Sequence, residues 1–275
     1  MFYASKNIMD APGFICMQNA LKIINDFDHT EHYLRSVPQF ANLSPETIAC
    51  FRDAAQLRSY EKDRILYIQE EPAKSFYIVC IGWVRLFHTL PEGDEVIVDM
   101  LTSGDMIGED AVFEHGIHMS SAQAITHTTL LGLPLAMLRE QVRRDQALAF
   151  NTLAYMSRHY RRHCDELALH ATQTAPQRVG HFLMKLCPRG KKGAVSFDLP
   201  YDKCLIASTL GMKGETFSRA LNALKRMAGV HISGMRVGID STEQLIKFVY
   251  DPASSPSSFC PLAVPRTKPE ISRVF

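Results

Sequence analysis

Polar side chains that recur at helical spacing late in this sequence are its clearest candidates for chemistry. Glu215, Ser218 and Arg219 stand at positions i, i+3 and i+4, so a helix here would present all three on one face. An arginine in this place can pair bidentately with guanine, and a glutamate can accept a hydrogen bond from cytosine N4. We therefore expect a surface that reads base edges of DNA. The expected DNA-binding residues are Lys213, Glu215, Thr216, Ser218 and Arg219.

A helix-turn-helix is the element that would position these side chains. Helical patterns cover 201–210 and 214–228, and Gly211 between them can adopt the positive φ of a tight turn. The apolar residues expected to face inward are Ile206, Ala207, Phe217, Leu221 and Leu224. Two short strands are expected at 230–233 and 235–240, and they would add a β-hairpin wing.

The distribution of charge favours a nucleic-acid partner. The chain has 275 residues with 30 Lys and Arg against 29 Asp and Glu, a net charge of +1 that by itself argues against such a partner. Residues 172–250, however, hold 12 basic and 5 acidic residues, whereas residues 1–171 hold 15 basic and 22 acidic ones. Such asymmetry points to a nucleic-acid-facing module. The basic loop at 189–193, Lys225 and Arg226 are expected to lie near phosphates.

The segment 60–133 has the character of a β domain. Short apolar runs rich in β-branched and aromatic residues alternate there with turn signals. The runs lie at 65–69, 76–81, 83–87, 95–101 and 129–134. This pattern predicts a sandwich, barrel or jelly roll. Ahead of it, Ser44-Pro45-Glu46 predicts a helix start, with Ser44 as the N-cap.

Residues 135–171 lack Gly and Pro and predict one long amphipathic helix after the β domain. Its heptad pattern indicates a dimer seam. The expected seam residues are Leu153, Tyr160 and Leu167 at a positions and Met156, His163 and His170 at d positions. A further helix is expected at 175–188. Residues 251–275 contain five Pro and five Ser, a composition that predicts a disordered tail.

From about residue 40 to residue 250, the sequence resembles the CRP/FNR superfamily of bacterial transcription regulators. The E-x-x-S-R pattern of Glu215, Ser218 and Arg219 is similar to the FNR type, which implies a TTGAT-like half-site in an inverted repeat. The segments LPYDKCLIASTLGMKGETFSRAL (199–221) and HMSSAQA (118–124) resemble the FNR/DNR-like branch, associated with anaerobic and nitrogen-oxide responses. The resemblance implies a cytoplasmic homodimer that binds double-stranded DNA, contacts RNA polymerase and acts as an activator.

The implied fold is α+β, with an N-terminal cyclic-nucleotide-binding-like β-roll (jelly roll), a long dimerisation helix and a C-terminal winged helix-turn-helix. The expected parts are an N-terminal extension (1–35), the β-roll sensor domain (36–140), the dimerisation helix (141–171), the DNA-binding domain (172–250) and the disordered tail (251–275). An effector or redox event in the β-roll would shift the long helices and align two recognition helices on adjacent major-groove turns.

The expected effector pocket comprises Gly108, Glu109, Ser120 and Ser121. In cyclic-AMP-binding members of the superfamily, a Gly-Glu pair binds the ribose and a following Arg-Ser pair neutralises the cyclic phosphate. Gly108-Glu109 matches the first pair, but the second reads Met119-Ser120 or Ser120-Ser121 and has no arginine. A buried cyclic phosphate would lose its main charge partner. The sequence therefore argues against cyclic AMP as the effector and predicts that Glu109 is a structural or hinge residue.

Metal cofactors depend on the cysteines and histidines available. Oxygen-sensing FNR proteins bind a 4Fe–4S cluster through four cysteines, three of them near the N-terminus. Here Cys16 is the only cysteine among the first 49 residues, and Leu131 stands at the position that resembles the fourth ligand. The sequence therefore argues against such a cluster. Haem stays open, with His163 and His170 as candidate ligands. We expect a response to nitric oxide, oxygen or redox state, with a cyclic nucleotide or another small molecule as the alternative.

Several other classes of protein are disfavoured. No apolar run approaches the ~20 residues of a membrane span, and the first residues lack a secretory pattern. The seven scattered cysteines argue against a disulfide framework and leave Cys80 or Cys164 as candidate thiol sensors. No GxGxxG, GxxxxGK(S/T), HExxH or GxSxG motif is present, so an enzyme is not expected. Two alternatives remain: a small-molecule-binding module whose helical end contacts protein, and a haem-based gas-binding protein that does not act through DNA.

Overall fold

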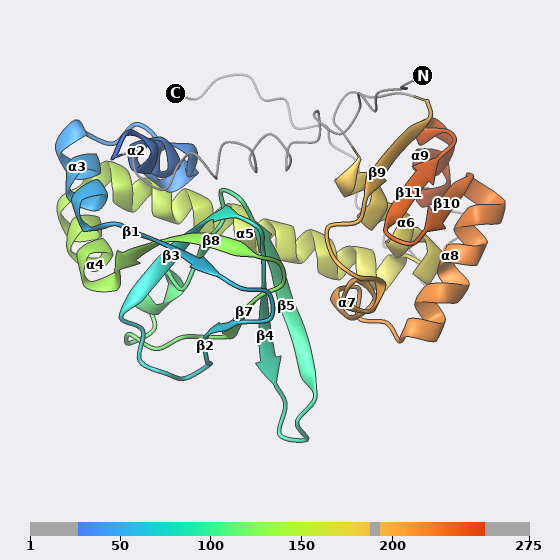
Figure 1. Ribbon diagram of the computed structural model, residues 1–275, viewed down its shortest axis with the longest axis horizontal. Coiled ribbons are helices and arrows are strands. Elements are labelled where there is room, and N and C mark those ends of the chain that lie inside the picture. Colours follow the sequence, from blue (N-terminus) through green and yellow to red (C-terminus); the bar gives the residue numbers. More distant parts are fainter. Residues whose placement is uncertain (1–26, 188–192, 251–275) are drawn as a thin grey trace, which may run out of the picture.

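Two halves, joined by one long helix, make up the described part of the chain (Figure 1). The computed structural model describes residues 27–187 and 193–250. The segments 1–26, 188–192 and 251–275 lie outside the described residues. Most of the predicted N-terminal extension, most of the predicted basic loop and the predicted tail fall in these segments.

The N-terminal half is a β-roll of two four-stranded antiparallel sheets. In sheet order, the first sheet consists of β1 (Gln56–Tyr60), β8 (Thr128–Pro134), β3 (Ser75–Ile81) and β6 (Met106–Ile107). The second consists of β2 (Ile65–Tyr67), β7 (Ser121–Ala124), β4 (Trp83–Thr89) and β5 (Glu95–Thr102). Val79, Val84 and Leu130 belong to one buried cluster that draws on both sheets. The jelly-roll prediction is confirmed.

Three strands of the β-roll have no counterpart among the predicted apolar runs. β1 (QLRSY) is polar and largely exposed, β6 has two residues, and β7 reads SAQA. β1 and β7 lack the apolar signature from which a strand is recognised, and β6 is too short to show one. β1 is a strand because it pairs residue by residue with the buried β8, from Gln56 with Gly132 to Tyr60 with Thr128.

Helices pack against the first sheet and its edges (Figure 1). They are α2 (Phe27–Ser36), α3 (Pro45–Ala54) and α4 (Leu135–Arg144), with the 3₁₀ turns η1 (Pro38–Phe40) and η2 (Asp110–Val112). Ser44 accepts a hydrogen bond from the Thr47 N–H at 3.1 Å, which confirms the predicted start of α3. Phe40 and Phe51 meet edge to face with ring centroids 4.9 Å apart and fix this layer on the core.

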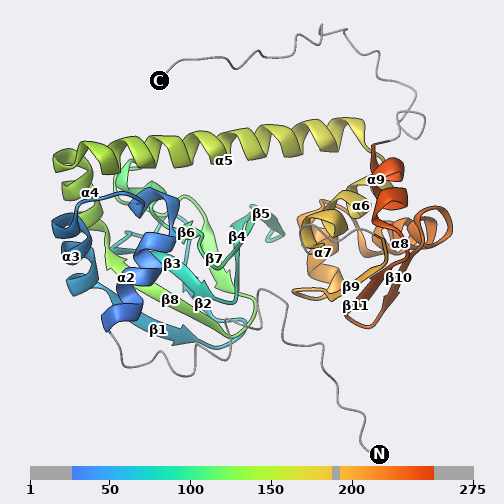
Figure 2. The same ribbon diagram turned by 90° about the horizontal axis from the view of Figure 1, so that it is seen from above.

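The prediction of one uninterrupted helix over 135–171 is wrong. The helical conformation is interrupted at Asp145, which separates α4 from α5 (Gln146–Thr172). The Asp145 carboxylate accepts hydrogen bonds from two backbone N–H groups of the first turn of α5, at 2.9 and 3.1 Å, and from the Thr47 hydroxyl at 2.8 Å. Such an N-cap starts a new helix. The long helix therefore begins at Gln146 and runs alongside both halves (Figure 2).

The C-terminal half is a winged helix-turn-helix. Its helices are α6 (Ala175–Leu186), α7 (Lys203–Thr209), α8 (Gly214–Ala228) and α9 (Thr242–Val249). An antiparallel sheet contains, in order, β10 (Val230–Ser233), β11 (Arg236–Ile239) and β9 (Val195–Asp198). The predicted α6, α7, α8 and both wing strands are confirmed, whereas β9 and α9 were not predicted. α6 and α9 pack so closely that a Cβ on Gly180 would lie 2.8 Å from Val249.

Candidate nucleic-acid interface

The helix-turn-helix consists of α7, a tight turn and α8. Asp202 caps α7 by accepting a hydrogen bond from the Leu205 N–H at 2.9 Å. In the turn, Gly211 has a φ of 60°, a left-handed conformation that glycine adopts without steric cost. The Met212 N–H donates to the Ala207 carbonyl at 2.9 Å and closes the turn. The predicted turn glycine is confirmed.

The two faces of α8 differ in exposure. The buried face consists of Phe217, Ala220, Leu224 and Ala228. Of the five predicted DNA-binding residues, the exposed ones are Lys213, Glu215, Ser218 and Arg219, and the half-buried one is Thr216. The structure thus brings the predicted residues together on the solvent side, as a base-reading face requires.

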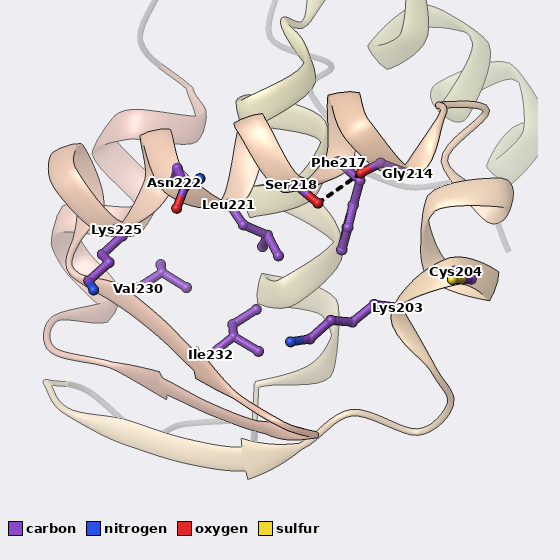
Figure 3. A pocket seen from close by; sticks show the side chains of 10 residues that line it. All are labelled: Lys203, Cys204, Gly214, Phe217, Ser218, Leu221, Asn222, Lys225, Val230 and Ile232. Carbon is purple, nitrogen blue, oxygen red and sulfur yellow. Dashed lines mark hydrogen bonds between the residues drawn. The ribbon is translucent and has the colours of Figure 1, made fainter.

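Contacts within α8 orient this reading face. Glu215 Oε1 lies 3.4 Å from Arg219 Nη2, and both side chains are largely exposed. Ser218 donates its hydroxyl proton to the Gly214 carbonyl at 2.9 Å (Figure 3). Its oxygen lone pairs therefore stay available as hydrogen-bond acceptors. The helix therefore presents one ion pair and one oriented hydroxyl to solvent.

A groove of about 440 Å³ borders the reading face. Figure 3 shows it between α8 and β10, with the Lys203 ammonium group reaching from α7 toward Ile232. Lys225 and Asn222 of α8 also line the groove. The sequence predicted no role for Lys203 or Asn222, although Asn222 follows Ser218 by four residues and so extends the same helical face. The two lysines place positive charge where a phosphate backbone could lie.

α5 carries an exposed apolar stripe. Its large side chains are 45–73% exposed and comprise Phe150, Leu153, Met156, Tyr160 and Leu167. Four of them are predicted seam residues, and Phe150 lengthens the stripe toward the start of the helix. The two predicted seam histidines also have polar neighbours within the chain. His163 Nδ1 lies 3.8 Å from the Glu166 carboxylate, and His170 Nδ1 lies 3.1 Å from the Arg178 guanidinium.

The two histidines predicted as haem ligands are not brought together. His163 and His170 are two turns apart, about 10 Å along the helix axis. Instead, potential ligand atoms of His163, His159 and Asp99 lie within 4.8 Å of one another, the one such group of three among the described residues. Asp99, however, is paired with the Arg162 guanidinium. The Asp99 carboxylate therefore already has a cationic partner within the chain.

The first predicted effector residues lie where β6 leads into η2. Gly108 has a φ of 77°, and a Cβ there would lie 3.3 Å from the His118 ring. That ring is buried and stacks on Tyr67 with centroids 3.7 Å apart. Burial, with the negative charge of Asp110, raises the pKa of Glu109 to about 8. At neutral pH, Glu109 is therefore largely protonated.

The predicted phosphate end of the pocket is also buried. Ser120 and Ser121 are 7% and 3% exposed, and the Ser121 hydroxyl accepts a hydrogen bond from the Gln69 N–H at 3.0 Å. The sequence from Gly108 to Ser121 contains neither Arg nor Lys. No cation from this segment is available to neutralise a phosphate at the two serines.

Comparison with known proteins finds relatives for both halves. The family model of the cyclic nucleotide-binding domain matches residues 57–145, and that of the Crp-like helix-turn-helix domain matches 177–248. The cyclic AMP receptor protein of Thermus thermophilus is 30% identical over 70% of this chain and 87% of its own length. The nitrogen fixation regulation protein FixK of Rhizobium meliloti is 30% identical over 65% and 79%, respectively. The structure of FixK2 from Bradyrhizobium japonicum aligns with a TM-score of 0.61 at 28% identity, over 70% of this chain and 96% of that one.

A cyclic-nucleotide-binding-like β-roll joined through a long helix to a winged helix-turn-helix defines a DNA-binding transcription regulator. The chain belongs to the CRP/FNR family of such regulators, whose members bind DNA as dimers and are not enzymes. Within residues 27–187 and 193–250, no helix has both the length and the apolar composition needed to cross a membrane.

Proposed function

We propose that this regulator reads a TTGAT-like inverted repeat through the exposed face of α8. The observation that carries the proposal is the joint exposure of Glu215, Ser218 and Arg219 on one face of that helix. Arg219 would pair with guanine and Glu215 would accept from cytosine N4. The residues that would contact phosphates beside them are Lys203, Lys213, Thr216 and Lys225.

Two copies of the chain pair along α5 in this proposal. The apolar stripe from Phe150 to Leu167 is too extensive to be left in water without a partner. Its residues recur three, four or seven apart, as a helix–helix seam requires. A two-fold axis along this seam would bring two copies of α8 into successive major grooves, about 34 Å apart.

The signal in this proposal is nitric oxide, oxygen or redox state. The lack of a cation between Gly108 and Ser121 argues against a cyclic phosphate as the ligand. Cys164 is exposed on α5 whereas Cys80 is buried, so Cys164 is the accessible thiol of the two. An absorption spectrum with and without added haem and nitric oxide tests the haem alternative, which the lack of a Soret band would exclude.

The proposal places the regulator in the cytoplasm, where the DNA and RNA polymerase are. A dimer bound at a promoter would contact the polymerase and activate transcription. RNA synthesis from a promoter that carries the inverted repeat, with purified polymerase, tests this part. More transcript with the regulator supports activation, and less transcript would show repression instead.

The DNA proposal is tested by binding to the duplex TTGAT-N4-ATCAA. We expect the protein to prefer it to a duplex with scrambled half-sites by about 10³-fold or more at fixed salt. Lengthening the spacer by five base pairs, about half a helical turn, should remove most of this preference because it turns the second half-site away from its α8. Equal affinity for all three duplexes would overturn the proposal.

A further inference from the structure

A cavity of about 950 Å³ lies between the β-roll, α5 and the helix-turn-helix. Figure 2 shows β4 and β5 on one side of this region, α6 and α7 on the other, and α5 running past both. None of the residues that line the cavity comes from the predicted effector segment between Gly108 and Ser121. The cavity is thus separate from the predicted effector pocket. Residues of both the β-roll and the DNA-binding half line it.

One wall of the cavity is aromatic. Trp83 of β4 meets Tyr201 edge to face with ring centroids 5.4 Å apart, and Phe182 of α6 lies 6.4 Å from the same Tyr201 ring. Tyr250 also lines the cavity. A wall of this kind provides apolar faces on which a flat ring can stack.

Other residues that line the cavity are positively charged. Arg158, Arg161, Arg162, Arg178 and Lys185 line the cavity, against Asp99, Asp165 and Glu166. Asp99 is paired with Arg162 and Glu166 with Lys185. Among the described residues, no ion pair neutralises Arg158 or Arg161. The cavity therefore has positive charge to offer an anion.

The histidines of the cavity add little to this charge. Burial and the neighbouring Arg178 lower the pKa of His170, and burial and Lys185 lower that of His181. Both imidazoles are therefore largely neutral at physiological pH, and arginine and lysine supply the positive charge. This charge is consequently insensitive to pH in the neutral range.

Polar atoms around the cavity lack partners. Within the described part of the chain, the buried atoms without a hydrogen-bond partner include Nε of Arg162 and Arg178, Nδ1 of His181 and Oε1 of Gln173, all in cavity-lining residues. Protein interiors leave few such groups unpaired, because each costs free energy. A ligand with acceptor oxygens would give the guanidinium groups new partners after small side-chain shifts.

One lining residue connects the cavity to the DNA-reading element. Arg178 Nη1 donates to the carbonyl of Leu210 at 3.2 Å and lies 3.1 Å from His170 Nδ1 of α5. Leu210 directly precedes Gly211, the residue that forms the turn before α8. A ligand that draws the Arg178 guanidinium away would change the contact that ties this turn to α5.

We propose that this interdomain cavity binds a small ligand that combines a flat apolar ring with an anionic group, such as a phosphate or carboxylate. The ring would lie against Trp83 and Tyr201, and the anionic group would meet the arginines. Occupation of the cavity then changes DNA affinity through Arg178 and Leu210, a consequence that rests on the DNA-binding function proposed above.

The probe for binding is 1-anilinonaphthalene-8-sulfonate, which has aromatic rings and one fixed negative charge. Trp83 is the only tryptophan of the chain, so energy transfer from indole to probe reports binding near this cavity. We expect saturable energy transfer in the full-length dimer. In Arg158→Gln and in Arg161→Gln, the affinity for the probe should be about tenfold lower than in the wild type, or lower still. The matched control is Arg143→Gln, an exposed arginine of α4 that does not line the cavity. Equal probe affinity in all four proteins, or no energy transfer, would overturn the proposal.

Displacement of the probe identifies the anionic group. Guanosine 5′-monophosphate and 1-naphthoate present a phosphate and a carboxylate on flat rings, whereas the uncharged 1-naphthalenemethanol lacks the anion. We expect at least one of the two anions to displace the probe and the neutral alcohol to be ineffective. Displacement by the alcohol as readily as by the anions would overturn the requirement for charge, and failure of both anions would overturn the ligand class.

The regulatory consequence is measured as DNA affinity with and without saturating probe. We expect the probe to change the affinity for the inverted repeat severalfold in the wild type and in Arg143→Gln. The expected change is smaller in Arg178→Gln, which loses the bond to Leu210. A probe that binds without changing DNA affinity overturns the coupling alone. Loss of sequence-specific DNA binding without any probe would overturn the proposed function and leave the cavity result intact.

Discussion

The carboxylate of Glu215 lies 3.4 Å from the guanidinium of Arg219, one turn further along α8. Both side chains stand in solvent, so the pair contributes little to folding. Its consequence concerns DNA recognition. In the function proposed above, the two side chains would meet DNA together, Arg219 at guanine and Glu215 at cytosine N4.

Arg219→Ala is expected to weaken binding to the inverted repeat by about 1–3 kcal/mol and to relax the preference for guanine at one position of each half-site. Arg219→Lys should retain part of the affinity but not the preference, because an ammonium group lacks the bidentate fork. Fluorescence anisotropy with matched duplexes at fixed salt measures both quantities. An unchanged base preference in Arg219→Ala would refute the assignment of this residue.

Lys225→Ala is expected to weaken binding to specific and scrambled duplexes alike, because phosphate contacts carry no sequence information. The slope of log affinity against log salt concentration should fall by about one. Arg143→Ala removes an exposed positive charge from α4, far from α8 in sequence and in fold, and should leave the slope as it is. If only the affinity for the specific duplex falls, Lys225 contacts a base edge and not a phosphate.

Leu153→Glu and Leu167→Glu are expected to convert the dimer to monomers, because each would place carboxylates against an apolar seam. Sedimentation velocity gives the oligomeric state, and circular dichroism checks that the monomer remains folded. Ile68→Glu is the matched control, since Ile68 is 52% exposed on the β-roll and lies off α5. If both α5 variants remain dimeric, the dimer interface does not lie along this stripe of α5.

The reading helix could be predicted from the sequence because its determinants are local. The spacing of Phe217 and Leu224 fixes the buried face of α8, and Gly211 supplies the turn. Both follow from helical periodicity and glycine stereochemistry alone. The opposite face, with Glu215 and Arg219, is then determined without any knowledge of the tertiary structure.

The surroundings of the α5 histidines could not be predicted in the same way. The heptad predicts His163 and His170 at the seam, and within one copy of the chain His163 lies near Asp99 of β5 and His170 contacts Arg178 of α6. These partners are remote in sequence, so helical spacing carries no information about them. The same holds for β1, which is a strand only because β8 pairs with it.

Glu109 should make stability depend on pH. Its pKa is raised from 4.5 to about 8 in the folded protein, so the folded state retains a proton that the unfolded chain releases within this window. Stability therefore falls as pH rises from about 4.5 to about 8, by at most ~1.4 kcal/mol per pH unit.

Glu109→Gln stays uncharged at every pH and removes this dependence. The variant should match the wild type near pH 4.5, and its advantage should grow until about pH 8 and then level off. Urea unfolding across this range gives the free energies. Parallel profiles for the two proteins would show that Glu109 titrates normally. Glu114→Gln, an exposed neighbour, is the control and should follow the wild type.

Asp145 should determine where α5 begins. Asp145→Ala removes the N-cap and leaves the Thr47 hydroxyl without its acceptor, so the free energy of unfolding should fall by ~0.5–2 kcal/mol. Asp145→Asn keeps an acceptor oxygen at the cap and should lose much less. Asp165→Ala, at an exposed position within the same helix, should change stability by no more than about 0.5 kcal/mol. If the Asp145→Ala and Asp165→Ala variants unfold at the same urea concentration, the cap does not stabilise the break, and the division between α4 and α5 must arise from packing alone.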